Sequence, residues 1–260
     1  FGIECTARYF VIINTRSDLR QIYAEPEFLS LPKLILGGGS NVLLCGNFNG
    51  LVLKIELQGI EVLANDYVKV QDGENWHDFV LWGIENDYNG IENLSLIPGN
   101  VGTAPMQNIG AYGVELKNVF FELEAYHISS KEVHVFSKSK CGFGYRESVF
   151  KNIFKGQYII LSVTFKLAKD GVVTLNYGAI KQVLNDNGIE NPSPKQVSDA
   201  VIFIRKSKLP DPVEIGNSGS FFKNPVILKT KFQKLQKQFT TIPSYPINDA
   251  EVKIPAGWLI

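Results

Sequence analysis

The chain has 260 residues, of which 45% are hydrophobic and 20% charged, an ordinary composition for a globular protein that can bury a sizeable core. Basic and acidic residues both number 26, which argues against non-specific nucleic-acid binding, since that needs a basic surface. Three widely spaced cysteines fit neither a disulfide framework nor CxxC zinc ligands, and no apolar run is long enough to span a bilayer. A reducing compartment is therefore expected, with no signal peptide and no metal. The histidines lack HExxH spacing and are expected to be structural: His77, His127 and His134.

The first half of the chain predicts short helices and strands in no fixed alternation. A helix is expected over 17–26, where Ser17 suits an N-cap and Pro26 ends the pattern. Strands are expected over 31–36, 51–57 and 67–73, and a further helix over 74–86. One face of that helix carries Trp76, Phe79, Val80, Gly83 and Ile84.

The second half continues in the same mixed way, with strands expected over 119–128, 132–137 and 158–167. A helix is expected from Ser193 as N-cap, with Pro194 at its first position. Gln196 completes a capping box, and the apolar stripe that follows is Val197, Ala200, Val201 and Ile204. A last helix over 227–239 carries Leu228, Phe232, Leu235 and Phe239 on one side. Without regular βαβ alternation, these elements favour an α+β fold.

A glycine run at 37–41, within LILGGGSN, follows the strand expected at 31–36. Glycines let backbone N–H groups converge on an anion, and they accept positive φ. The run is not GxGxxG, because position 42 is valine, and it is not a P-loop, because no GK[ST] follows. The next residues, NVLL, are more strand-like than helical, which argues against a Rossmann arrangement. A tight hairpin and an anion-binding loop are the two interpretations.

Three other stretches carry candidate chemistry. The Gly/Pro/Asn-rich segment 93–116 is either a loop that approaches a flat cofactor edge or a structural Ω-loop. CGFGYRES places Tyr145 and Arg146 after a Gly–aromatic–Gly turn, where the arginine fork suits a carboxylate or phosphate, or a plain surface ion pair. In GNSGSFFKNP, Ser220 has no neighbouring base and no GxSxG elbow, so a nucleophile is disfavoured while proton donation stays open.

Taken together and in order, several motifs resemble one family closely. They are LILGGGSNVLL, GIENLSLIPGNVGTAPMQNIGAYGVEL, CGFGYRESVFK, KLPDP, GNSGSFFKNP and PAGWLI. The family that they resemble is UDP-N-acetylenolpyruvoylglucosamine reductase, also called UDP-N-acetylmuramate dehydrogenase or MurB. The motifs span nearly the whole chain, and their collinear order is far more specific than one glycine run. LNYGAI and the spacing after CGFGYRES are similar to the longer, first type of this family, as in enterobacteria.

The resemblance implies an α+β fold with a vanillyl-alcohol-oxidase-type FAD-binding domain, whose subdomains would be residues 1–50 and 51–207, followed by a substrate-binding domain at 208–260. It also implies a cytoplasmic bacterial enzyme. A monomer is the default expectation, and the charge balance and the short apolar runs predict no nucleic-acid or membrane partner. In the family, NADPH reduces a noncovalent FAD, which passes hydride from N5 to C3 of UDP-N-acetylglucosamine enolpyruvate. Protonation at C2 then gives UDP-N-acetylmuramate for peptidoglycan precursor synthesis.

Carried over residue by residue, Ser220 matches the proton donor to C2, with Phe221 and Phe222 expected to anchor its turn. Arg146 matches the arginine that holds the substrate carboxylate as negative charge builds on it. Substrate contacts are implied for Tyr145, Tyr177 and Lys208, and contacts with the UDP and its diphosphate for Asn224, Tyr245 and Lys253. FAD contacts are implied for Gly37, Gly38, Gly39, Ser40, Asn41, Pro98, Gly99, Gly102, Thr103, Gln107, Asn108, Gly110 and Ala111.

One departure from the family pattern concerns the end of the chain. The chain begins with Phe1 rather than Met and stops at the apolar PAGWLI, so residues are expected to be missing at both ends. The family carries a catalytic glutamate beyond AGWLI, and Glu251 is no substitute because it precedes that motif. Two alternatives to the reductase stay open: a truncated, inactive fragment that binds FAD or a nucleotide sugar, and another FAD oxidoreductase of the same fold.

Overall fold

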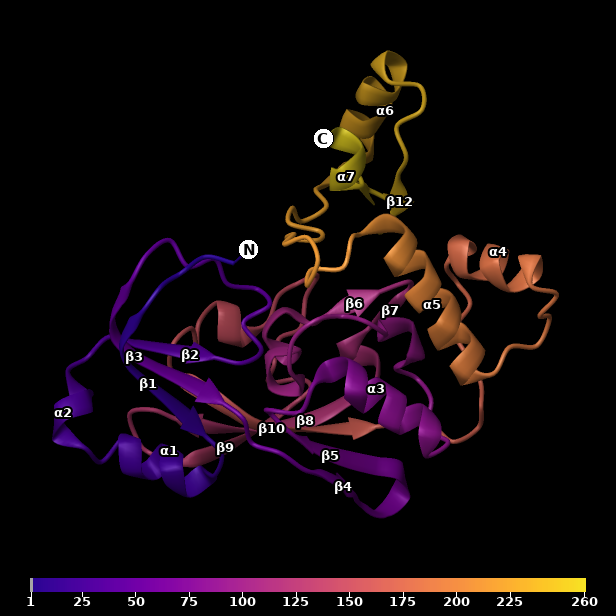
Figure 1. The fold of residues 1–260 in the computed structure, drawn as a ribbon. Coiled ribbons are helices and arrows are strands. Elements are labelled where there is room, and N and C mark those ends of the chain that lie inside the picture. The colour runs from indigo at the N-terminus through magenta and orange to yellow at the C-terminus, as the bar shows by residue number, and fades with distance from the viewer. Residues whose placement is uncertain (1) are drawn as a thin grey trace. The chain divides into compact units, whose positions relative to one another are not determined.

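The structure is a computed structural model that describes residues 2–260. The chain divides into two compact units, Phe1–Glu214 and Ile215–Ile260, and each is described by itself (Figure 1). Both units mix strands and helices, in agreement with the expected α+β class. Within residues 2–260, no helix combines the length and apolar character needed to cross a bilayer.

The first unit begins with a three-stranded parallel sheet. Its strands are β1 (Ala7–Ile13), β2 (Lys33–Leu36) and β3 (Phe48–Ile55), in the order β1-β3-β2. Two short helices, α1 (Arg16–Ile22) and α2 (Pro26–Leu29), lie between β1 and β2 in the chain. A buried apolar cluster that includes Ile13, Leu19 and Leu53 joins this sheet to the helices.

Helix α1 starts earlier than the sequence pattern predicts. Its N-cap is Thr15, whose side chain accepts a hydrogen bond from the backbone N–H of Asp18, over 3.1 Å. The Asp18 carboxylate in turn accepts from the backbone N–H of Thr15 over 2.8 Å. This reciprocal pair satisfies two otherwise unpaired N–H groups, so Ser17, the predicted N-cap, lies inside the helix.

The glycine run at 37–41 follows β2, and the tight-hairpin interpretation of it is wrong. Because β2 and β3 run parallel, the connection between them must carry the chain from the C-terminal end of β2 back to the end of the sheet at which both strands begin. The strand-like residues 42–44 form no strand in this structure. The run is therefore part of a long connection at the C-terminal end of β2, free to approach another segment.

A five-stranded antiparallel sheet forms the larger part of the first unit. Its strands, in sheet order, are β4 (Ile60–Val62), β5 (Tyr67–Gln71), β10 (Tyr158–Lys166), β8 (Phe120–His127) and β9 (Val133–Ser137). Helix α3 (Trp76–Glu85) packs on one face of it (Figure 1). Four residues of the predicted face of α3 are buried: Trp76, Phe79, Val80 and Gly83. The first three belong to the cluster that includes Val70 and Phe165 of the sheet. The fifth residue of that face, Ile84, is partly buried.

Short elements link α3 to the rest of the sheet. They are the 3-10 helices η2 (Glu92–Leu94), η3 (Val101–Thr103), η4 (Pro105–Gln107) and η5 (Leu116–Asn118), and a small hairpin of β6 (Gly110–Ala111) and β7 (Val114–Glu115). Two more 3-10 turns are η1 (Ala64–Asp66) and η6 (Val149–Lys151). The segment 93–116 is thus an ordered loop whose residues are nearly all buried or half-buried, as its apolar composition predicts.

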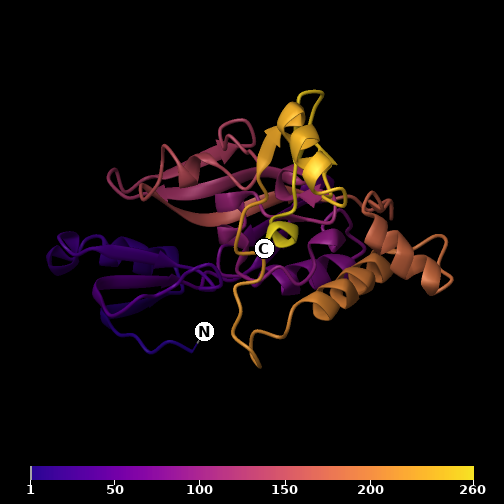
Figure 2. The same cartoon turned by 90° about the horizontal axis from the view of Figure 1, so that it is seen from above.

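Two helices close the first unit, α4 (Gly178–Asp186) and α5 (Pro194–Lys208), which lie side by side (Figure 2). The capping box of α5 is confirmed: Ser193 Oγ accepts from the N–H of Gln196 at 3.3 Å, and Gln196 Oε1 accepts from the N–H of Ser193 at 2.8 Å. Its predicted stripe is buried against Ile180 and Leu184 of α4: Val197, Ala200, Val201 and Ile204.

The second unit is a small α+β body. A three-stranded antiparallel sheet of β11 (Val226–Leu228), β13 (Glu251–Lys253) and β12 (Tyr245–Pro246) accompanies α6 (Lys229–Gln238) and α7 (Ala256–Leu259). Its core is Phe232, Ile242, Val252 and Ile254. The predicted stripe of α6 is only partly confirmed. Phe232 is buried, but Leu228 and Phe239 are exposed because they lie just outside the helix, at its N-cap and C-cap.

Candidate cofactor cavity and active-site residues

The glycine run and the 98–109 segment together line a cavity of about 260 Å³ in the first unit. Eight of the residues expected to contact FAD line it: Gly37, Gly38, Gly39, Ser40, Asn41, Pro98, Thr103 and Gln107. Apolar walls come from Trp76 of α3 and from Ile109. Two segments that are far apart in sequence therefore converge on one concave site, which the anion-binding interpretation of the glycine run requires.

Close backbone approach explains why the run is made of glycines. A Cβ atom at Gly37 would lie 2.6 Å from Cγ2 of Thr103, and one at Gly38 would lie 2.7 Å from Oδ1 of Asn100. Both distances are shorter than real side chains tolerate, so any larger residue would push the two loops apart. Across the same contact, Asn41 Nδ2 donates to Gln107 Oε1 at 2.9 Å.

The second loop is held from behind by the segment that leads into α3. The backbone N–H of Trp76 donates to the carbonyl of Gly99 at 3.0 Å, and Asn100 Nδ2 donates to the carbonyl of Gly73 at 3.1 Å. Thr103 Oγ1 donates to the carbonyl of Asn100 at 2.8 Å. These bonds fix the side of the loop that faces away from the glycine run, and so the shape of the cavity.

Five of the expected FAD contacts do not line the cavity. Gly99, at φ +109°, leaves room for Ser40 Oγ, which would lie 2.9 Å from an added Cβ. Gly102 packs directly on Asp72. The other three lie at the start of the β6–β7 hairpin: Asn108, Gly110 and Ala111. Their contact with a cofactor stays a proposal.

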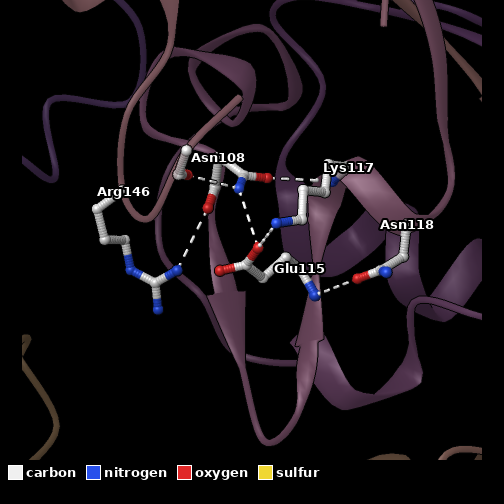
Figure 3. A network of polar contacts seen from close by, with 6 residues as sticks. Asn108, Glu115, Lys117, Asn118 and Arg146 are labelled. Atoms are coloured by element: carbon white, nitrogen blue, oxygen red, sulfur yellow. Dashed lines mark hydrogen bonds and ion pairs between the residues drawn. The ribbon is translucent and has the colours of Figure 1, made fainter. Parts of the chain in front are cut away.

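Asn108 is fully buried and is the centre of a network of polar contacts (Figure 3). Its side-chain Nδ2 donates to the carbonyl of Gly144 at 2.9 Å and to Oε2 of Glu115 at 3.2 Å, and its Oδ1 accepts from the N–H of Lys117 at 3.1 Å. Asn108 also adopts φ +43°, a left-handed conformation that asparagine tolerates better than most residues. The network therefore sets the path of the chain between η4 and the hairpin.

Arg146 attaches to the same network through the backbone. Its guanidinium donates to the carbonyl of Asn108 at 3.2 Å and to the carbonyl of Gly110, and it lies 5.3 Å from the centre of the Tyr145 ring. Within residues 2–260 these partners are carbonyl oxygens and an aromatic face, so the plain surface ion pair is not formed. Neutral partners leave the positive charge of Arg146 uncompensated, which suits an anionic ligand.

Two further expected substrate contacts belong to the helical end of the first unit. Tyr177 is the N-cap residue of α4, and its ring packs edge-to-face on Tyr112, with centroids 5.2 Å apart. Lys208 is the exposed last residue of α5. Tyr112 in turn connects to the half-buried Arg205 of α5, whose pKa is lowered by its partial burial.

The other four expected site residues lie in the second unit. Tyr245 of β12 and Lys253 of β13 are directly opposite each other in the antiparallel register, so their side chains share one face of the sheet. Asn224 Oδ1 accepts from the N–H of Ala256 at 2.8 Å, which ties the loop before β11 to α7. Ser220 lies in an exposed bend outside any helix or strand.

The expected anchoring of the Ser220 turn by two phenylalanines is wrong for this structure. Phe221 is 70% exposed and Phe222 58% exposed, and they pack edge-to-face mainly on each other. The turn is instead shaped locally, by Asn217 Oδ1, which accepts from the N–H of Gly219 at 3.1 Å. Two large exposed aromatic rings beside Ser220 can exclude water from a ligand that binds there.

Sequence reasoning missed nine of the residues that line the cavity, and three of these carry polar or aromatic side chains: Trp76, Asn100 and Lys151. Trp76 was expected only as a core residue of α3, and Asn100 and Lys151 lie within quoted motifs without a special pattern of their own. Lys151, at the end of η6, carries the one ionisable side chain among the described residues that line the cavity. Its positive charge complements a pyrophosphate.

The histidines make structural contacts. His77 Nδ1 accepts from the N–H of Leu96 at 3.2 Å, and burial lowers the pKa of this imidazole. His127 and His134 stack with ring centroids 5.3 Å apart on neighbouring strands. Across residues 2–260, no cluster of three histidine, cysteine or acidic side chains could hold a metal ion.

The residues of the cavity fit a dinucleotide such as FAD. Glycines leave backbone N–H groups uncovered for a pyrophosphate, and Lys151 adds a cation. Uncharged polar side chains and apolar walls suit the rest of such a ligand: Ser40, Asn41, Thr103, Gln107, Trp76 and Ile109.

Comparison with known proteins agrees with this description of the cavity. Residues 7–133 match the family described as "FAD binding domain". Proteins named UDP-N-acetylenolpyruvoylglucosamine reductase from Flavobacterium johnsoniae and Amoebophilus asiaticus are 50% and 48% identical over all of this chain, which covers 78% of each. A crystal structure of the protein of that name (MurB) from Thermus caldophilus aligns with a TM-score of 0.59 at 19% identity. The alignment covers 95% of this chain and 80% of the Thermus caldophilus chain, and it supports the fold.

Proposed function

Because the chain belongs to the UDP-N-acetylenolpyruvoylglucosamine reductase family, we propose that it is an FAD-dependent oxidoreductase that uses NADPH to reduce UDP-N-acetylglucosamine enolpyruvate to UDP-N-acetylmuramate. The observation that carries the proposal is the glycine-lined cavity. It lies in a chain that is 50% identical, over all of its own residues, to a protein named as this reductase. The reaction belongs to peptidoglycan precursor synthesis, and we propose that the chain works in the bacterial cytoplasm as a monomer.

The first unit provides the cofactor site. Backbone N–H groups of the 37–41 run and the Lys151 ammonium hold the FAD pyrophosphate, and Gln107 and Thr103 orient the cofactor from the facing loop. When bound, FAD would supply the hydride-transfer chemistry between NADPH and the substrate. The chain's own residues keep water out and fix the substrate beside it.

Arg146 is the electrostatic element of the reaction. Its charge, held by the carbonyls of Asn108 and Gly110, binds the substrate carboxylate and stabilises the negative charge that builds on it after hydride addition to C3. Tyr145 stacks beside the guanidinium and orients it. Tyr177 and Lys208 contact the substrate from α4 and α5.

Residues of the second unit complete the reaction. Ser220 donates the proton to C2, which a serine can do when the acceptor carbanion is strongly basic and water is excluded. Asn224, Tyr245 and Lys253 bind the UDP and its diphosphate, and the opposite positions of Tyr245 and Lys253 on β12 and β13 support their acting together. In domain terms we propose FAD-binding subdomains at 1–50 and 51–207 and a substrate-binding domain at 208–260.

Two half-reactions test the proposal under anaerobic conditions. NADPH titrated into the FAD-loaded chain is expected to bleach the flavin absorbance, and addition of UDP-N-acetylglucosamine enolpyruvate is expected to restore it, with UDP-N-acetylmuramate as product. Bleaching without recovery on addition of substrate identifies a chain that binds FAD and accepts hydride from NADPH but cannot reduce the sugar nucleotide. Rapid recovery with oxygen but not with the sugar nucleotide identifies an oxidase of the same fold. Either result overturns the proposed activity.

A further inference from the structure

Asp72 is a buried carboxyl group that none of the roles above uses. It follows β5 directly, its exposed fraction is 5%, and its Oδ1 has no hydrogen-bond partner within residues 2–260. An unpaired buried polar atom is costly, because it gives up its bonds to water. Such a group calls for an explanation beyond stability.

The Asp72 carboxyl lies directly behind the loop that lines the cofactor cavity. A Cβ atom at Gly102 would lie 2.0 Å from Asp72 Oδ1 and 2.1 Å from its Cγ, so the loop backbone rests on the carboxyl group itself. The N–H of Gly102 also donates to the backbone carbonyl of Asp72 at 3.1 Å. The next residue, Thr103, lines the cavity and faces Gly37.

The charge of Asp72 is not balanced by its surroundings. Burial raises the pKa of its carboxyl to about 8, opposed only in part by the N–H of Gly102. On the segments packed around it, Glu74 accepts from the N–H of Gly59 at 2.6 Å, and Lys69 pairs with Glu124 at 2.8 Å. With these charged groups engaged elsewhere, the carboxyl can be neutral where most carboxyls are ionised.

We propose that Asp72 is a positioning residue of the FAD cavity: its neutral carboxyl supports the loop at 99–103, and its ionisation places a negative charge behind that loop and weakens binding of the FAD pyrophosphate. The inference rests on the proposed binding of FAD in this cavity. It predicts that cofactor affinity, rather than the chemical step, falls between neutral and mildly alkaline pH. Asp72 acts through the loop and does not touch the substrate.

The test measures FAD affinity of the flavin-free chain by quenching of FAD fluorescence between pH 6.5 and pH 9. For the native chain the Kd is expected to rise across this interval, by about tenfold for each unit by which bound FAD raises the pKa of Asp72. Asp72→Asn, which keeps the shape and cannot ionise, is expected to hold the Kd near the native value at pH 6.5 throughout. Asp72→Ala is expected to remove the pH dependence as well, but to weaken binding at every pH because the loop loses its support.

Each outcome decides a separate point. Equal pH profiles for the native chain and Asp72→Asn overturn the inference while FAD binding stands. Asp72→Ala binding as tightly as Asp72→Asn overturns the positioning role. If Asp72→Asn fails to fold, a native Kd that stays constant to pH 9 still overturns the inference. Failure of the native chain to bind FAD at any pH instead overturns the proposed function, and the inference with it.

Discussion

The guanidinium of Arg146 donates to the backbone carbonyl of Asn108, 3.2 Å away, while the side chain of Asn108 is itself fixed by bonds to Gly144 and Lys117. Arg146 and Asn108 both adopt positive φ, so neither segment would keep this path as a free loop. The arginine is thus held at its base by its own turn and at its head by the loop at 108–110. Its direction is set before any substrate arrives, and such preorganisation is what electrostatic catalysis requires.

Replacing Arg146 by lysine tests this arrangement. Lysine keeps the charge but loses the planar fork, so after bonding two carbonyls it has only one donor left and cannot bind a carboxylate bidentately. We expect the rate of substrate reduction to fall about 10²- to 10³-fold, the usual effect of losing one preorganised donor. Flavin reduction by NADPH should be nearly unchanged. Anaerobic stopped-flow absorbance at the flavin band measures the two half-reactions separately.

The matched control is Arg8→Lys, on the exposed edge of β1, where the arginine lies over the Tyr9 ring. It should leave both half-reactions at the native rates. A uniform loss in both half-reactions of Arg146→Lys would contradict the proposed role, because it would indicate a damaged flavin site rather than lost stabilisation of the substrate.

Gly37→Ala tests the packing between the two cavity loops. The new methyl group would lie 2.6 Å from Cγ2 of Thr103 and force the loops apart. Overpacking of this kind costs about 1–3 kcal/mol, so FAD should bind about 5- to 150-fold more weakly, as fluorescence quenching can measure. Adding Thr103→Ser removes the Cγ2 methyl group of Thr103 but keeps the hydroxyl that donates to the carbonyl of Asn100. The double variant should therefore recover affinity for FAD.

Gly257→Ala is the control for this pair, because its Cβ would meet no atom within 4 Å and it lies in helix α7. FAD affinity should not change there. If Gly37→Ala binds FAD as the native chain does, or if Thr103→Ser fails to restore binding, the contact between Gly37 and Thr103 does not shape the cofactor site.

The sequence was informative where a local rule decides the structure. Ser193 and Gln196 form the predicted capping box because three residues suffice to define it. It was uninformative where distant segments decide. Lys151 lines the cavity because η6 packs near the 105–107 turn. Asp72 is buried because Gly102 covers it. Neither contact leaves a recognisable pattern in the amino-acid sequence. The glycine run lay between these cases: its composition suggested close approach, but only the parallel pairing of β2 and β3 excluded a hairpin.

Ser220→Ala tests the proton donor in the second unit. Without the hydroxyl, hydride transfer has no proton to complete it at C2, so substrate reduction should slow by about 10²-fold or more while NADPH still reduces the flavin at the native rate. Ser218→Ala, two residues earlier in the same exposed loop, is the matched control and should change neither rate. Product formed in D₂O should carry deuterium at C2 in the native chain. Equal losses for the two serine variants would argue that the loop, and not the Ser220 hydroxyl, matters.

The lowered pKa of Glu124, on β8, leads to a prediction of how the stability of the first unit changes in acid. Burial opposes ionisation of this carboxyl, but hydrogen bonds and charges from Lys69 and Arg16 outweigh it and lower its pKa to about 2. Because the folded-state pKa lies below the ordinary value, the group contributes stability above about pH 4.5, and that stability is lost as the pH falls toward 2. Glu124→Gln should therefore lower the free energy of unfolding at pH 7 by about 1–2 kcal/mol, less than the full pKa difference implies because solvent screens a partly exposed group.

Urea unfolding at a series of pH values measures this effect. The deficit of Glu124→Gln relative to the native chain should be constant from pH 7 to about pH 5 and shrink below that. Asp199→Asn removes an exposed pair with Lys195, 2.5 Å apart on α5, and should change stability by less than about 0.5 kcal/mol at any pH. A Glu124→Gln deficit that persists unchanged at pH 3 would show that shape, and not charge, makes Glu124 stabilising. Glu124 also accepts from the uncharged Ser162 hydroxyl of β10 at 3.0 Å. Ser162→Ala measures this bond separately, and its loss should cost the same at every pH at which Glu124 stays ionised.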